Sequence, residues 1–166
     1  MTRLMGPAAV GPNIDECTTN NDPFFPLGSI VEGENGKAYR RVQFVDIGTA
    51  TYAVNKMAVL ADADADEWKV TIDVSGGNAI AGLHPVGVVV AVPDATHTYG
   101  WVQIRGVASA VMGSASVIAG DWLMPDSSED GDIEEATAGT HENICAYALA
   151  TIADDATGKV MLYNLG

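Results

Sequence analysis

Acidic side chains form the pattern in this sequence that comes nearest to a metal site. Within residues 126–134, Asp126, Ser128 and Asp130 alternate and are followed by a glycine, as in a calcium-binding loop. The twelfth position of such a loop is Thr137, where a bidentate glutamate would be needed. The flanking segments carry strand patterns, whereas calcium loops of this kind join helices. The segment therefore favours a solvated hairpin tip over a cation site.

A second acidic cluster consists of Asp62, Asp64, Asp66 and Glu67. On a strand, carboxylates two residues apart would share one face and repel one another. A solvated loop avoids this repulsion and is the favoured interpretation. A bound cation or a basic partner surface is the alternative.

Candidates for nucleophilic or metal chemistry are scattered along the chain. The histidines His84, His97 and His141 show no metal-ligand spacing, and Cys17 and Cys145 lack the CxxC spacing of a redox or zinc pair. Neither a GxSxG nucleophile elbow nor a glycine-rich phosphate loop is present. We therefore expect free thiols, no cofactor and no catalytic site, and keep a hydrolase only as a third hypothesis.

Composition limits the possible partners. The 166 residues suffice for one domain with a core. Eight Lys and Arg against 22 Asp and Glu give a net charge of −14, which disfavours direct binding to nucleic acid and favours solubility or a basic partner. No apolar stretch reaches about 18 residues, so no membrane span is predicted. Because no signal-peptide pattern is visible, we expect synthesis in a cytoplasm.

Hydrophobic patterning predicts short strands. Residues 69–74 alternate, which predicts a strand buried on one face only. The β-branched run at 86–93 predicts a strand buried on both faces, and residues 101–108 alternate again. Residues 144–152 favour a strand. Residues 53–65 could hold a short helix.

Turn signals join these strands into hairpins. Asn-Gly at 35–36 and Asp-Gly at 130–131 tolerate the positive φ of tight hairpin turns. Residues 151–165 predict a third hairpin that turns at 155–158. Short strands with glycine-rich turns predict an all-β fold, a small β-sandwich or barrel spanning residues 29–166.

The first 28 residues predict an extended N-terminal arm. They hold four of the seven prolines and show no helical or strand period, so they cannot pair along a sheet as a whole. They are nevertheless rich in apolar residues, unlike a solvated disordered tail. We expect this arm to become ordered against a neighbour, through Leu4, Pro7, Pro12, Phe24, Phe25 and Pro26.

Aromatic residues add further interface candidates. Phe24 and Phe25 are interpreted either as anchors on a partner or as a cap on the chain's own barrel. Trp101 alternates with polar residues and is expected on the more polar strand face, either at an intersubunit contact or beneath a loop. Trp122 is expected in the core.

Three arginines are scarce positive charges in this acidic chain. Arg40, Arg41 and Arg105 could pair with acidic surfaces of neighbouring molecules, or serve within the chain itself. Together with Trp101 they complete the set of candidate interface residues.

Part of the chain resembles a known family. YGWVQIRGVASAV at residues 99–111, followed by AGDWLMPDSSEDGDIEEATAG and ICAYALATIADDATGKVMLYN, resembles tailed-phage head-decoration proteins, also called capsid cement proteins. The shared order is an aromatic-Gly-Trp strand, an AGDWL turn, an acidic DG hairpin and an Ala-rich strand closing on GKVMLY. Residues 25–44 resemble the opening hairpin of similar virion proteins, so the resemblance covers residues 25–166.

The resemblance implies a β-rich domain that forms a homotrimer on the outer surface of a phage capsid. Such a protein would bind the major capsid protein and tie neighbouring subunits of the shell together. The path of the arm does not carry over, because residues 1–21 match no known pattern. The alternative hypothesis is a virion adhesin that binds a host glycan or receptor, with aromatics around Trp101 stacking on sugar rings.

Overall fold

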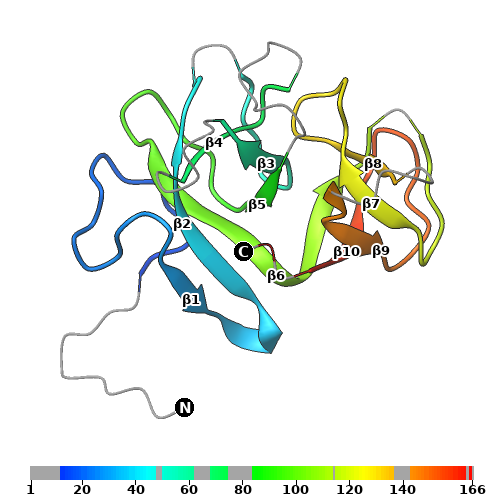
Figure 1. The fold of residues 1–166 in the computed structure, drawn as a ribbon, viewed down its shortest axis with the longest axis horizontal. Coiled ribbons are helices and arrows are strands. Elements are labelled where there is room, and N and C mark those ends of the chain that lie inside the picture. Colours follow the sequence, from blue (N-terminus) through cyan, green and yellow to red (C-terminus); the bar gives the residue numbers. More distant parts are fainter. Residues whose placement is uncertain are drawn as a thin grey trace.

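The computed structural model describes residues 12–47, 50–61, 68–74, 84–113, 115–136, 143–163 and 165. This part of the chain forms β-strands and one 3₁₀ turn without an α-helix, which confirms the all-β prediction (Figure 1). None of these residues belongs to a helix that could cross a membrane. The elements are β1 (Ile30–Glu32), η1 (Glu34–Gly36), β2 (Ala38–Phe44), β3 (Met57–Leu60), β4 (Lys69–Thr71), β5 (Pro85–Val89), β6 (Tyr99–Val111), β7 (Trp122–Pro125), β8 (Ile133–Glu135), β9 (Ala146–Ala148) and β10 (Thr157–Leu162).

Five strands close a barrel, which decides between the two predicted architectures. The order is β2-β4-β3-β5-β6, and β6 pairs back to β2. The β2–β4 pair is parallel and the other pairs in the barrel are antiparallel. Closure leaves no free edge within the barrel.

Strand β6 links the barrel to a second sheet. Its first half pairs with β2, and its second half, from Gly106 to Val111, pairs with β10. Gly106 lies at the junction with φ +86, and a Cβ there would come within 3.1 Å of the carbonyl oxygen of Gly36. Glycine therefore allows β6 to turn the corner visible in Figure 1.

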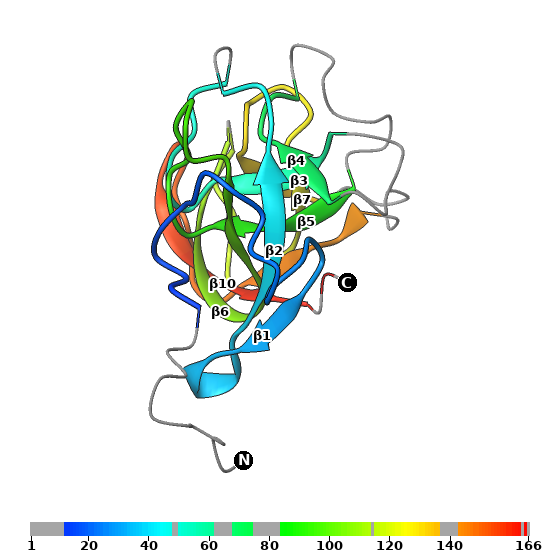
Figure 2. The ribbon, with the colours of Figure 1, turned by 90° about the vertical axis from the view of Figure 1, so that its left-hand side faces the viewer.

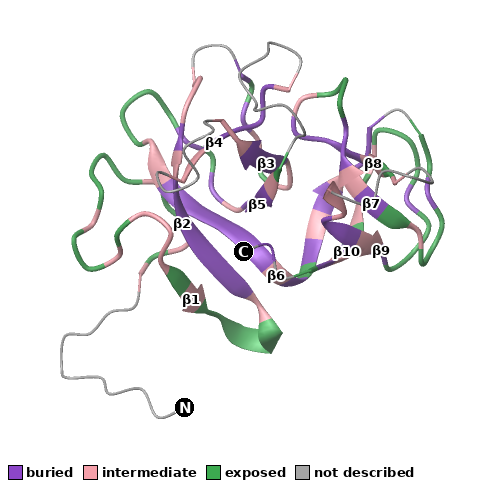
Figure 3. Ribbon diagram, viewed as in Figure 1, coloured by how far each residue is buried: buried purple, intermediate pink, exposed green. Residues whose placement is uncertain are grey.

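The second sheet has the order β6-β10-β9-β7-β8. Alternate residues of its strands face a core that is continuous with the barrel interior, including Ala110, Leu123, Ala146 and Val160. Figure 3 shows the run of buried residues along β2 and the first half of β6. Burial of this apolar surface is the main force holding the two parts together.

Two of the three predicted hairpins are confirmed. β1 pairs with β2 through η1, where Asn35 and Gly36 have φ of 57° and 74°. β7 pairs with β8 across the Asp-Gly turn. The third hairpin is wrong in its first strand: β10 pairs antiparallel with the preceding strand β9, but β9 covers Ala146–Ala148, and Ile152 bridges to Val117 instead.

The predictions for single strands have mixed outcomes. The strands at 86–93 and 144–152 are confirmed in part: β5 is buried from Val86 to Val89, and β9 covers Ala146–Ala148. The possible helix at 53–65 is wrong where the chain is described, because residues 57–60 form β3.

The prediction that residues 69–74 are buried on one face only is also wrong. Thr71 and Asp73 are buried as well as Val70 and Ile72. The reason is that β4 lies inside the barrel wall between β2 and β3, and Asp130 from the β7–β8 turn accepts a hydrogen bond from Val74 N.

Candidate functional site

Residues 12–28, here called the N-terminal segment, lie on the outside of the barrel. Figure 2 shows this segment in dark blue running beside β2 and β6. Thr18 forms a β-bridge with Tyr99, with backbone bonds of 2.7 Å and 3.0 Å. Further on, Gly28 N donates to the carbonyl oxygen of Arg41, which leads the chain into β1. The sequence predicts that the arm becomes ordered against a neighbouring molecule. In the structure, residues 12–28 lie in part against the chain's own barrel.

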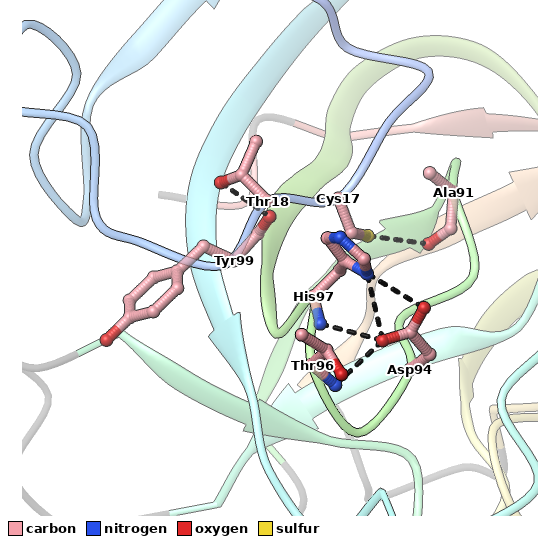
Figure 4. Close-up of polar contacts among 7 residues, drawn as sticks. All are labelled: Cys17, Thr18, Ala91, Asp94, Thr96, His97 and Tyr99. Carbon is pink, nitrogen blue, oxygen red and sulfur yellow. Dashed lines mark hydrogen bonds and ion pairs between the residues drawn. The ribbon is translucent and has the colours of Figure 1, made fainter.

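The loop before β6 is shaped to receive this segment. One carboxylate oxygen of Asp94 accepts hydrogen bonds from the backbone N of Thr96 at 2.7 Å and of His97 at 2.8 Å. The His97 ring nitrogen Nδ1 lies 2.9 and 3.0 Å from the two Asp94 oxygens (Figure 4). Hydrogen bonds from His97 and Thr96 lower the pKa of Asp94 from 3.8 to about 2. The ionised carboxylate therefore organises the loop at neutral pH.

Cys17 brings a thiol close to this Asp–His pair. Its Sγ donates to the carbonyl oxygen of Ala91 at 3.6 Å (Figure 4). A surface hollow of about 540 Å³ is lined by Asp15, Glu16, Cys17, Asp94 and His97, among others. The grouping of Cys, His and Asp resembles the composition of a nucleophilic site.

The electrostatics of Cys17 oppose that chemistry. Burial raises the pKa of the thiol to about 11, with a lowering contribution from Arg41 and a raising one from Asp94. The thiolate is the nucleophilic form, and reactive cysteines have lowered pKa values. Cys17 therefore serves as a packed thiol between the N-terminal segment and the barrel. Burial also raises the pKa of Cys145, and both cysteines are free.

A second contact holds the N-terminal segment over Trp101. The Phe25 ring meets the Trp101 ring edge to face at 5.7 Å. The Arg41 guanidinium lies 5.6 Å from the same indole ring, and its Nη2 donates to Thr18 Oγ1 at 2.6 Å. A hollow of only about 80 Å³ remains between Pro12 and these side chains. Trp101, which is 1% exposed, is thus covered from outside the barrel.

This burial corrects two expectations about aromatic residues. Trp101 is not available for stacking on a sugar ring, because Phe25 and Arg41 cover it. Trp122 is not in the core but 49% exposed. The residue after Trp122, Leu123, points into the core instead, so the tryptophan takes the outer face by strand alternation.

The predicted interface arginines are held by contacts within the chain. Arg40 lies 3.9 Å from the Trp68 ring centre and donates from Nη1 to the Leu165 carbonyl oxygen at 3.0 Å. Burial lowers the pKa of both Arg40 and Arg41. Arg105 of β6 forms an ion pair with Glu32 of β1. The sequence left two roles open for these arginines, pairing with a neighbouring molecule or pairing within the chain. The contacts in this structure are of the second kind.

The other predicted interface residues divide by position. Phe24 is 85% exposed, Pro26 is exposed, and Pro12 and Phe25 are half-buried. Leu4 and Pro7 lie outside the described residues, as do the cluster at 62–67 and the histidine at 141. The interface roles of these residues and the division of the chain at residue 28 stay predictions.

The acidic loop at 126–134 is only partly the solvated tip that was predicted. Its centre is exposed, but Asp126 and Asp132 are buried. Asp126 Oδ1 accepts hydrogen bonds from Ser128 N and Oγ, both at 2.7 Å, and Asp132 forms an ion pair with Lys56. These carboxylates brace the β7–β8 turn against the barrel. In the part of the chain that the structure describes, no three His, Cys, Asp or Glu residues are grouped so as to hold a metal ion.

The outer face of the second sheet carries a group of aromatic residues that was not predicted from the sequence. The rings of Trp122, Tyr147 and Tyr163 cluster on the outer face of the second sheet. The alternation of the strands could have predicted this cluster. The neighbours of the three rings point inward, so the rings must point outward; these neighbours are Leu123, Ala146, Ala148 and Leu162.

The comparisons with known proteins give a likeness in fold. No protein-family model matches the chain, and no curated protein matches it in sequence. Among solved structures it is similar to the head fiber gp8.5 N base of bacteriophage phi29, with a TM-score of 0.51 and 12% identity. The match covers 82% of this chain and 96% of that one. At this identity the likeness establishes a shared fold.

Proposed function

We propose that this protein is a structural protein of a phage virion that attaches to the outer surface of the capsid. The observation that carries the proposal is the fold shared with a phage head fiber base, over 82% of this chain and 96% of the other. The resemblance of residues 25–166 to head-decoration proteins supports the same role.

Within that role, we infer a cement function. The protein binds the major capsid protein as a homotrimer, and it stabilises the shell by adding buried area across the seams between capsid subunits. Three attachment points on one trimer raise the effective concentration of each, so contacts that are weak alone become strong together. The work is adhesive and needs no bond to be made or broken.

The exposed tip of the N-terminal segment is suited to contact the shell. Phe24 N donates to Asp22 Oδ1 at 2.8 Å, and Phe25 N donates to the Asp22 carbonyl oxygen at 3.1 Å. Pro23 lies within this turn and Pro26 follows it directly, so little backbone freedom remains to be lost on binding. Phe25 faces the barrel and Phe24 faces solvent, which makes Phe24 a preorganised aromatic anchor.

Binding to purified shells tests this function. We expect the full chain to co-sediment with expanded capsids and not with unexpanded ones. Phe24→Ala should weaken binding by about 10-fold or more, as expected for an anchor worth more than about 1.4 kcal/mol. The matched control is Val92→Ala, because Val92 is also an exposed apolar residue, at 52%. Equal binding to both shell forms, or binding to neither, would count against the proposal.

A further inference from the structure

The outer face of the second sheet carries an apolar row that crosses four strands. Val107 of β6 pairs with Met161 of β10, Met161 pairs with Tyr147 of β9, and Tyr147 pairs with Trp122 of β7. These side chains point away from the core, because their strand neighbours are the buried ones. The register therefore aligns four apolar side chains side by side on the outside of the molecule.

Aromatic contacts consolidate this row at one end. Tyr163, just after β10, stacks on Trp122 with ring centres 5.4 Å apart and an interplanar angle of 20°. Tyr147 lies 6.1 Å from Trp122 and 5.9 Å from Tyr163. Trp122 and Tyr163 remain 49% and 37% exposed. We call Val107, Trp122, Tyr147, Met161 and Tyr163 the aromatic face.

The aromatic face has the wrong character for a solvated surface. An antiparallel sheet with one face on the core normally presents polar residues on the other. None of the five residues is charged, in a chain whose net charge is −14. Contiguous apolar surface of this kind marks an interaction site, and aromatic residues are enriched in the centres of protein interfaces.

Charges flank the aromatic face asymmetrically. Lys159 of β10 lies on the outer face on one side and donates to Ser109 Oγ at 2.8 Å. Glu134 of β8, the strand that ends the sheet, lies on the outer face on the opposite side. A cation next to Met161 on β10 and a carboxylate on the end strand β8 suit a cyclic arrangement, in which the β8 edge of each copy meets the Lys159 region of the next.

We propose that the aromatic face packs against the same face of two further copies of this chain about a threefold axis. The proposal rests on the homotrimer inferred above and names the surface that forms it. Copies of so acidic a chain repel one another, and the aromatic face lets them meet without bringing carboxylates together. Around the axis, Lys159 of each copy approaches Glu134 of the next.

The first test is the mass of the full chain in solution by light scattering after gel filtration. We expect three times the 17.2 kDa of one chain. Trp122→Glu and, independently, Tyr163→Glu should each shift the assembly to monomer, with association weakened at least 100-fold. Val92→Glu is the control, because it places the same charge on an exposed apolar residue outside the aromatic face. Circular dichroism of each variant separates loss of association from loss of fold.

Exchanging the two charges tests the predicted contact between Lys159 of one copy and Glu134 of the next. Lys159→Glu should weaken the trimer about 10-fold, and adding Glu134→Lys in the same chain should restore it. Restoration requires the two residues to meet across copies, so an additive loss in the double variant would overturn the cyclic arrangement.

Shell binding, measured on the same samples, separates this inference from the proposed function. A wild-type monomer that binds shells would overturn the inference and leave the function standing. A wild-type trimer that depends on Trp122 but binds no shell would overturn the proposed function and leave the inference standing. If the Trp122→Glu variant stays trimeric and loses shell binding, the aromatic face contacts the capsid and the inference is wrong.

Discussion

Trp101 of β6 and Trp122 of β7 lie in the two different parts of the molecule, and their surroundings differ. Each points outward from its sheet, Trp101 from the barrel and Trp122 from the second sheet. Trp101 is covered by Phe25 and Arg41 and is 1% exposed, whereas Trp122 is 49% exposed and contacts the rings of Tyr147 and Tyr163 on the same face. The barrel is covered by the chain's own N-terminal segment, and the second sheet is not covered by any described part of the chain.

The chain covers the outside of its barrel with its own N-terminal segment, whereas the outer face of the second sheet is left for another molecule to cover. The N-terminal segment attaches through a β-bridge, a proline-limited turn and an aromatic anchor, which are the means by which an extended segment binds another protein. The aromatic face has the apolar character of a binding surface without such a segment. The proposed self-association therefore uses the second sheet, and the proposed shell contact uses the exposed tip near Phe24.

The largest expected effect separates the two tryptophans. Trp101→Ala should lower the free energy of unfolding by about 3–5 kcal/mol, because it leaves a cavity beneath Phe25 and Arg41. Trp122→Ala should change the free energy of unfolding of the monomer by less than about 1 kcal/mol. Urea unfolding monitored by circular dichroism measures both. Similar losses in the free energy of unfolding for the two variants would contradict the difference in burial between Trp101 and Trp122.

Reactivity of Cys17 reports whether the N-terminal segment covers the barrel in solution. Because burial raises the thiol pKa to about 11, iodoacetamide should modify it on the order of 100-fold more slowly at pH 8 than in the unfolded chain. The rate should keep rising as pH approaches 11. Site-resolved mass spectrometry follows the reaction. A rate at pH 8 equal to that of the unfolded chain would mean that the segment does not seal the thiol.

The corner at Gly106 keeps the two regions in their relative positions. Gly106→Ala should destabilise the protein by about 1–3 kcal/mol, because φ of +86 strains an L-residue and the new Cβ would approach the Gly36 carbonyl oxygen at 3.1 Å. Gly120→Ala is the matched control, since Gly120 also has positive φ but open space around its Cα. A Gly106 variant no less stable than the Gly120 variant would contradict the role of the contact at this corner.

The smallest effect concerns the loop that receives the N-terminal segment. The pKa of Asp94 is depressed to about 2, so the stabilisation of the loop is present above the ordinary value near 3.8 and is lost as pH falls through 2. Amide chemical shifts of Thr96 and His97 should therefore titrate with a midpoint near 2, and Asp94→Asn should remove that transition. A midpoint near 4 would show that the loop contacts do not hold in solution.

Local sequence patterns predicted the all-β class and two hairpins because turn chemistry acts over a few residues. Asn35 and Gly36 take the positive φ that their types favour, and the Asp-Gly turn joins β7 and β8 as expected. The first strand of the third hairpin lies at Ala146–Ala148 and not from residue 151 onward, because Val117, distant in sequence, bridges to Ile152. Pairing between distant segments is not encoded in local pattern.

Predictions about side-chain exposure were less successful, since they depend on what covers a strand. Thr71 and Asp73 read as solvent-facing in an alternating strand, but the β7–β8 turn lies against that part of the chain. Trp101 lies on the outer face of β6, as predicted, and of the two predicted alternatives the structure shows the covered one, beneath the N-terminal segment. Trp122 is predicted in the core, but the phase of the strand alternation places it on the outer face.

A reconstruction of expanded capsids incubated with the full chain tests the central claim most directly. The account predicts density on the outer surface of the shell, with Phe24 against a capsid subunit and three aromatic faces meeting about a local threefold axis. Absence of the protein from the shell, or bound copies whose Trp122 and Tyr163 remain in solvent while other surfaces join them, would contradict it.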